Sequence, residues 1–262
     1  MNAGLYLVGT PIGNLADVTL RSLDTLRGVS VIFAEDTRIS RRLLERHAIP
    51  TPLMSCHKFN EQSRAEQIIL RIQGGEAVAL VTDSGMPGIS DPGSRVAASC
   101  REAGLSVTVI PGPSAVTSAV ALCGFEGEGF VFAGFLPRKI GARTRALQRL
   151  LSSDVPAVLF ESPFRVVRTL EELEALAPDR RVFIARELTK FFEETLSGTP
   201  ATLLARFRAR PPKGEFVLVL SAAPPLRGKD RKERRGAVVE SVSVVSNGIV
   251  GSGREEKRDA PK

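Results

Sequence analysis

The residue types that build metal and disulfide sites are scarce in this chain. Its 262 residues include three cysteines and two histidines. Cys56, Cys100 and Cys123 form an odd and widely spaced set, so we expect neither a disulfide framework nor a zinc site. His47 and His57 stand alone in the sequence, and therefore no metal is predicted. Unpaired cysteines are typical of the reducing cytoplasm, which is the expected location.

Long apolar runs are also missing. No run approaches the roughly eighteen residues that a membrane span requires, and the opening MNAGLYLVGTP lacks the order of a signal peptide. We expect a soluble protein without membrane association. The net charge of +7 permits a nucleic-acid partner but does not require one, because a basic tail alone would contribute the same sign.

The common phosphate-binding motifs are absent too, since neither G-x-x-x-x-G-K-[ST] nor G-x-G-x-x-G follows an apolar run. What the sequence does contain is an alternation of short apolar runs with segments of helical spacing. The predicted strands are residues 5–9, 29–34, 77–82 and 105–110, and the predicted helices are residues 20–26, 39–46, 64–72 and 94–102. This alternation predicts an α/β fold with a largely parallel sheet.

The alternation restarts after a glycine-rich segment near residue 125. Further strands are predicted at residues 130–135, 157–162, 181–186 and 215–220. We therefore expect two α/β domains with a cleft between them, an N-terminal domain at 1–124 and a C-terminal domain at 125–222. Residues 223–262 lose apolar periodicity and gain glycine and basic residues, which predicts a mostly disordered basic tail.

Four loops rich in glycine and proline follow the strands of the first half. They are GTPIGN (9–14), AEDTR (34–38), DSGMPGISDPG (83–93) and PGPSA (111–115). Ligands of open parallel sheets bind at the carboxyl ends of the strands, and such residues let the backbone approach a ligand closely. Four loops at one edge therefore predict a binding cleft.

These loops belong to a longer set of motifs. Seven segments carry a resemblance to a known family, and they follow one another along the chain as 9–44, VTDSGMPGISDPG, VTVIPGPSAV, FAGFLPRK, FESPFRV, ARELTKFFEE and KGEFVLVL. Through these segments the sequence resembles the ribosomal RNA small subunit methyltransferase I family of the tetrapyrrole methylase superfamily. The resemblance implies a homodimer that binds S-adenosylmethionine between two α/β domains. It implies transfer of the methyl group to the ribose 2′-oxygen of a cytidine in the decoding region of the small-subunit (16S) RNA, either free or in the assembled subunit. The residues that it places at the cofactor are Pro11, Gly85, Met86, Ile89, Ser114 and Ala115.

Two charge clusters at strand ends suit the chemistry that the resemblance implies. A hydroxyl that attacks a methyl group must be aligned and then lose its proton, which positioned acids and bases can assist. The predicted catalytic residues are Glu35, Asp36, Arg38, Arg186, Glu187 and Lys190. His57 is the alternative proton acceptor, because Phe59 and Phe164 occupy positions where the family commonly has histidine.

A basic segment at 136–150 contains no acid. A helix there would present Arg138, Lys139, Arg143, Arg145 and Arg149 to RNA phosphates, and the resemblance adds Arg165. The low aromatic content of 5% favours recognition by charge and shape over base stacking.

Two alternative functions stay open at this point. One is a corrin-precursor or diphthamide-type methyltransferase of the same superfamily, and the other is a non-catalytic RNA-binding protein that keeps the cleft. The second is raised by Met86, which replaces the threonine usual in the family and so loses a hydroxyl contact to the cofactor.

Overall fold

The apolar runs of the first half form a parallel sheet. The computed structural model describes residues 1–224, and its first sheet has the strand order β3-β2-β4-β1-β5. The strands are β1 (Gly4–Val8), β2 (Val31–Ala34), β3 (Leu53–Ser55), β4 (Ala77–Val81) and β5 (Val107–Ile110). Every pairing in this sheet is parallel, as the alternation predicts. The three-residue strand β3 was not predicted, because it is too short to show a period.

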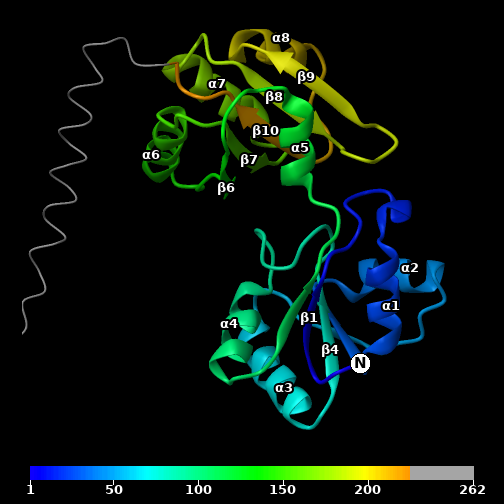
Figure 1. Cartoon of the computed structure of the whole chain (residues 1–262). Helices are drawn as coiled ribbons and strands as arrows, with labels where there is room; N and C mark the ends of the chain where they lie inside the picture. The colour runs from blue at the N-terminus through cyan, green and yellow to red at the C-terminus, as the bar shows by residue number, and fades with distance from the viewer. Residues whose placement is uncertain (225–262) are drawn as a thin grey trace, which may run out of the picture. The chain divides into compact units, whose positions relative to one another are not determined.

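Helices cover both faces of this sheet (Figure 1). They are α1 (Leu20–Gly28), α2 (Thr37–Arg46), α3 (Glu61–Gln73) and α4 (Ser94–Glu102), and a 3-10 turn, η1, spans Leu15–Asp17. Apolar residues of α1 and α2 pack on one face, and those of α3 and α4 pack on the other. The sheet is buried on both faces, which explains why its strands read as continuous apolar runs.

The second sheet is mixed. Its order is β6-β7-β10-β8-β9, with β6 (Val131–Phe135), β7 (Ala157–Glu161), β8 (Val182–Arg186), β9 (Glu194–Gly198) and β10 (Phe216–Leu220). Only the pairing of β6 with β7 is parallel. Strands β10 and β9 run antiparallel to their neighbours, and β9 was not predicted because ETLSG is half polar.

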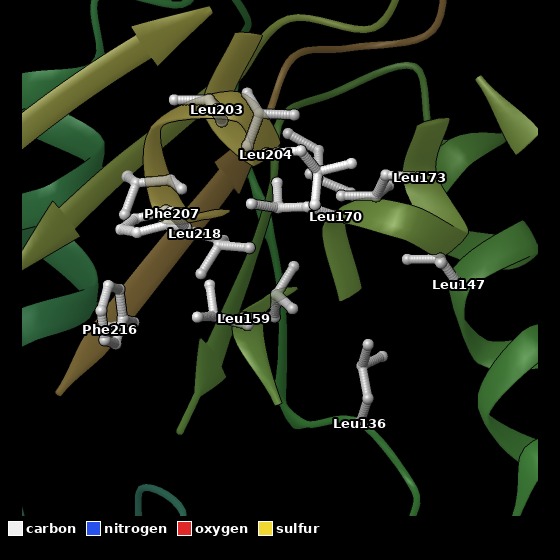
Figure 2. Packing of buried hydrophobic residues seen from close by; sticks show 14 of the residues in the cluster. Leu136, Leu147, Leu159, Leu170, Leu173, Leu203, Leu204, Phe207, Phe216 and Leu218 are labelled. Atoms are coloured by element: carbon white, nitrogen blue, oxygen red, sulfur yellow. The ribbon is translucent and has the colours of Figure 1, made fainter. Parts of the chain in front are cut away.

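Alternating side chains of the second sheet pack into two separate apolar clusters. On β10, Phe216, Leu218 and Leu220 join one apolar cluster, whereas Val217 and Val219 join another. The first cluster includes leucines from α6 (Ile140–Leu151), α7 (Val166–Leu176) and α8 (Pro200–Ala209), and Figure 2 shows these leucines above the strands.

Helix α5 (Ala115–Cys123) lies on the other face of this second sheet. Its residues Val116 and Ala119 share a cluster with Val158, Phe183 and Val217. The helix therefore packs on the C-terminal sheet, although its residues precede the predicted boundary at 124. The described chain forms one compact unit, Met1–Ala223, so the division into domains at 124 stays a prediction. The predicted disorder of the tail falls, apart from residues 223 and 224, outside the described residues.

Candidate active site

Three of the predicted loops meet at the carboxyl ends of the central strands. The backbones of Thr10 and Gly85 exchange two hydrogen bonds, of 2.9 and 3.2 Å. A Cβ atom at Gly9 would lie only 2.7 Å from the Cα of Gly112 and 2.6 Å from the sulfur of Met86. The loops after β1, β4 and β5 therefore touch through their backbones, and side chains at Gly9 or Gly112 would push them apart.

These loops form one wall of a cavity of about 260 Å³. Its lining includes five of the six predicted cofactor residues, Gly85, Met86, Ile89, Ser114 and Ala115. Gly85 adopts a positive φ of 79°, a backbone conformation that favours glycine. Pro11, the sixth predicted residue, is buried but is not part of the lining. The sequence thus identified the residues of this wall, while their binding of a cofactor stays a prediction.

The C-terminal half supplies the opposite wall, much of which the sequence analysis missed. Phe135 and Phe160 line the cavity with their ring centroids 5.6 Å apart. Ser162 follows β7, and Gly214 and Glu215 precede β10. The motifs FESPFRV and KGEFVLVL contain most of these positions, but nothing in the sequence shows which of their side chains face a cavity.

Asp91 is the chemically most unusual residue of the lining. Burial raises the pKa of its carboxyl group to about 7, and the negative charges of Glu35, Asp83 and Glu215 add to the increase. Burial also raises the pKa of Glu35, and the negative charge of Asp83 adds to this increase. Among the described residues, the Asp91 carboxyl group has no hydrogen-bond or ion-pair partner. A half-buried carboxylate without a partner costs stability and is therefore a candidate for function.

The first predicted catalytic cluster is paired internally. The carboxylate of Asp36 accepts a hydrogen bond of 2.8 Å from the backbone of Arg38 and so caps helix α2. It also pairs with the Arg38 guanidinium at 2.6 Å, and hydrogen bonding to Arg38 lowers the pKa of Asp36 to about 2. Neither residue, nor Glu35, lines the cavity.

The second cluster is also internally paired. The Lys190 ammonium lies 2.9 Å from Glu187 and 2.8 Å from Glu215, and Arg186 pairs with Glu194 at 3.2 Å. Lys190 therefore holds Glu215, which does line the cavity. The six predicted catalytic residues lie around the site without forming its wall, and a direct chemical role for them stays a prediction.

The loop that contains this second cluster also joins the two halves of the site. The side-chain oxygen of Thr189 accepts a hydrogen bond of 3.1 Å from the backbone of Asn14. Both Glu187 and Thr189 have positive φ angles, of 50° and 64°, which are strained for residues with side chains. The loop after β1 therefore docks on a tightly constrained turn after β8.

The prediction that Arg143 contacts RNA is corrected by the structure. Its side chain is only 2% exposed and pairs with Glu172 at 2.7 Å and Glu161 at 3.5 Å. It also donates a hydrogen bond of 2.6 Å to Thr169. Arg143 lies one helical turn before the buried Leu147, so its face of α6 points into the core, where acids from two other elements neutralise it.

The remaining basic residues divide into two groups. Arg165 is partly buried, pairs with Glu161 at 3.3 Å and donates to the carbonyl of Leu136 at 2.6 Å. It therefore anchors the segment before α6 to the loop after β7. In contrast, four side chains are exposed and free of ion pairs in the described part of the chain: Arg138, Lys139, Arg145 and Arg149.

His57, the alternative proton acceptor, does not line the cavity. Its Nδ1 atom accepts a hydrogen bond of 3.3 Å from the backbone of Phe59. The phenylalanines at the two positions where the resemblance implies histidine, Phe59 and Phe164, are each 95% exposed.

Within residues 1–224, no group of three or more His, Cys, Asp or Glu side chains is arranged to hold a metal ion. No helix in this range combines the length and apolar character that crossing a membrane requires. The three cysteines are buried and unpaired.

Comparison with known proteins identifies the family. The model of the tetrapyrrole (corrin/porphyrin) methylases matches residues 4–204. The chain is 46% identical to ribosomal RNA small subunit methyltransferase I of Thermotoga maritima, over 83% of this chain and 97% of that protein. It is 44% identical to the Synechocystis protein of the same name, over 84% and 80% of the two chains.

Solved structures agree on the fold. Diphthine synthase superposes with a TM-score of 0.67 at 16% identity, covering 85% of this chain and 90% of that one. A uroporphyrin-III C-methyltransferase from Thermus thermophilus, solved with S-adenosyl homocysteine, superposes with a TM-score of 0.60 at 16% identity, covering 82% and 96% of the two chains. With its two sheets and the cavity at their loops, the chain has the tetrapyrrole methylase fold and belongs to the ribosomal RNA small subunit methyltransferase I family.

Proposed function

We propose that this protein transfers a methyl group from S-adenosylmethionine to the ribose 2′-oxygen of a cytidine in the decoding region of small-subunit ribosomal RNA. The observation that carries the proposal is the cavity at the loop edges of the two sheets, with five predicted cofactor residues in one wall and an unpaired carboxylate beside them. The names of the relatives support RNA as the substrate class. The choice of nucleotide and atom rests on the resemblance of the motifs.

The residues present fit the cofactor. The volume of about 260 Å³ approaches the lower end of the range of roughly 300–1,000 Å³ typical of small-molecule sites. Ile12, Val116 and Leu188 offer apolar surface, and Ser84 and Ser114 offer hydroxyl groups. A sulfonium ion carries positive charge, and the negative field around Asp91 complements it. Met86 removes a hydroxyl contact but supplies apolar surface to the cavity.

S-adenosylmethionine supplies a methyl group already activated by its positively charged sulfur, which keeps the carbon–sulfur electrons on departure. The protein must orient the ribose and accept its proton. Among the cavity carboxylates, Glu161 is committed to Arg143, Thr169 and the backbone of Ser162. Glu215 is paired with Lys190. Asp91 alone among these three has no partner in the described part of the chain, and we assign to its carboxylate the role of proton acceptor.

Exposed arginines and lysines would hold the RNA. Arg138 and Lys139 precede α6, and Arg145 and Arg149 follow along it, so they form a track for phosphates. Lys190 and its two acidic partners keep the turn after β8 in place. The protein would work as a homodimer in the cytoplasm, as the resemblance implies, and the three unpaired cysteines suit a reducing compartment.

Mapping of ribose methylation tests the proposal. Small-subunit RNA from a strain lacking the gene should have lost one 2′-O-methylcytidine, and wild-type protein should restore it, whereas the Asp91→Asn variant should not. Restoration by Asp91→Asn would refute the assignment of the proton acceptor only. If no ribose methylation changes, the RNA substrate itself is wrong, and precorrin substrates should be assayed next. Binding of RNA and cofactor without transfer would favour the non-catalytic alternative.

A further inference from the structure

Three phenylalanine side chains are almost fully exposed on loops of the described chain. Phe59 and Phe164 are each 95% exposed, and Phe191 is 94% exposed. Single exposed apolar residues are common on protein surfaces. Rings with this degree of exposure, however, contribute almost nothing to a core, so the fold does not explain them.

The topology places all three rings at the ends of the two sheets where the loops of the cavity lie. Phe59 follows β3, which runs parallel to the other strands of the first sheet, so it shares an edge with the loops after β1, β4 and β5. Strands β7 and β8 both run antiparallel to β10 and therefore point the same way. Phe164 and Phe191 follow these two strands, and their edge also carries Ser162 and Glu215 of the cavity wall.

Each ring has a link to the cavity or to its charged surroundings. Phe164 follows Ser162 and Pro163, both of which line the cavity. The ring of Phe59 lies 6.1 Å from that of His57, and His57 is close enough to Glu35 to influence its pKa electrostatically. Phe191 makes an edge-to-face contact of 5.0 Å with Phe192 and directly follows Lys190. The rings therefore lie on three different loops at the strand ends where the cavity is found.

Exposed positive charges accompany two of these rings. Lys58 precedes Phe59 and is exposed. Arg165, which follows Phe164, binds the carbonyls of Leu136 and Pro137 and so keeps the exposed Arg138 and Lys139 beside the same loop. A flat apolar ring next to a cation is the combination that binds an unpaired nucleotide, because the ring stacks on the base while the cation meets the phosphate.

We propose that Phe59, Phe164 and Phe191 stack on unpaired bases that flank the target nucleotide, so that the substrate is single-stranded RNA at the site of methylation. This inference rests on the proposed RNA substrate and extends it to the conformation that the protein selects. It also revises the expectation from composition, since a chain with few aromatic residues can still place them where bases would enter.

The geometry favours bases over a second copy of the chain. Stable interfaces between proteins bury about 800 Å² per partner around a contiguous apolar centre from which lysine is depleted. Here the rings lie on three separate loops and stand beside lysine or arginine. Exposed rings on three separate loops match successive bases of a strand more closely than they match the contiguous apolar centre of a dimer interface.

Binding of labelled RNA by the full chain tests the inference. The probes are a single-stranded oligonucleotide with 2-aminopurine beside the target cytidine and the same sequence in a duplex. We expect wild-type protein to bind the single strand more tightly and to change its fluorescence through stacking. Phe164→Ala should weaken single-strand binding by roughly tenfold, with similar or smaller losses for Phe59→Ala and Phe191→Ala. Phe164→Trp should keep the affinity.

Leu70→Ala is the matched control. Leu70 is 69% exposed but lies near the end of α3, away from the strand edges that carry the cavity, so its loss should leave RNA affinity unchanged. The inference is overturned if the wild-type chain binds neither probe, if it binds both equally, or if the phenylalanine variants bind like wild type. It is also overturned if these variants change only the oligomeric state measured by sedimentation. Stacking without any methyl transfer to ribosomal RNA would instead leave the inference intact and refute the proposed function.

Discussion

The two sheets contribute to the cavity in different ways. The loops of the parallel first sheet approach through their backbones, with Gly9 against Gly112 and Thr10 paired with Gly85. The loops of the mixed second sheet contribute mainly side chains, including the rings of Phe135 and Phe160 and the carboxylate of Glu215. One half therefore offers a close-fitting surface for a flat ligand, and the other offers aromatic and charged groups.

This difference follows from how each half is stabilised. In the first half, glycine and proline fix the loop conformations locally. In the second half, ion pairs between distant segments hold the loops, as Arg143 and Arg165 do by binding Glu161 beneath the turn at Ser162. Changes to backbone positions should damage the first wall, whereas changes to charged residues should damage the second.

The largest expected effect is on the second half. Arg143→Ala removes one of the two countercharges of the fully buried Glu161 and empties the space of a buried side chain, and breaking a buried pair typically costs about 3–5 kcal/mol. We expect the free energy of unfolding to fall by that amount in chemical denaturation. Arg149→Ala on the exposed face of the same helix is the control and should change it by less than about 0.5 kcal/mol. A loss below about 1 kcal/mol for Arg143→Ala would show that Arg165 and Thr169 neutralise Glu161 by themselves.

The next largest effect is expected at Asp91, the residue of the first half that we propose as proton acceptor. Asp91→Asn should lower kcat by about a hundredfold or more, the typical contribution of a general base, while affinity for the product S-adenosylhomocysteine, whose sulfur carries no charge, stays near wild type. Since the pKa of Asp91 is raised to about 7 by burial and by Glu35, Asp83 and Glu215, the wild-type kcat/KM should rise with pH up to about 7 and then level off. An unchanged profile in the variant would assign the titration to another group.

A backbone change tests the first wall directly. Gly112→Ala would place its Cβ 2.9 Å from the backbone of Gly9, which should separate the loops and destabilise the fold by about 1–3 kcal/mol. Calorimetry should show weaker binding of S-adenosylmethionine. Gly129→Ala is the matched control, because its Cβ would meet no atom within 4 Å. Equal binding by both variants would mean that the contact between the loops does not shape the site.

The smallest effect should come from the exposed basic track. Replacing Arg145 and Arg149 together with glutamine should leave stability and cofactor affinity unchanged. If both contact phosphates, the slope of log K against log salt for RNA binding should decrease by about 0.7 for each residue removed. Parallel salt titrations of wild type and the double variant measure this change, and an identical slope would place the RNA elsewhere.

The elements of the first half were predictable because their information is local. Four apolar runs and the four loops after them lie where the sequence indicated, and five of the six predicted cofactor residues line the cavity. The second half was less predictable, since β9 has no apolar period and the antiparallel pairing of β10 depends on segments far apart in the chain. The spacing of Arg143 to Leu147 partly indicated that Arg143 is buried, but the sequence could not identify its acidic partners Glu161 and Glu172, because they belong to other elements.

By itself, the sequence determined the α/β alternation, the backbone character of the first wall and the family, because glycine, proline and apolar periodicity act over a few residues. Only the tertiary structure decided that α5 packs on the second sheet, that Arg143 is buried, that Asp91 has no partner within residues 1–224 and that three phenylalanines remain exposed. Burial and pairing depend on which distant segments come together. The pKa of a carboxyl group and the exposure of a ring therefore depend on neighbours in space, which a local pattern of residues does not identify.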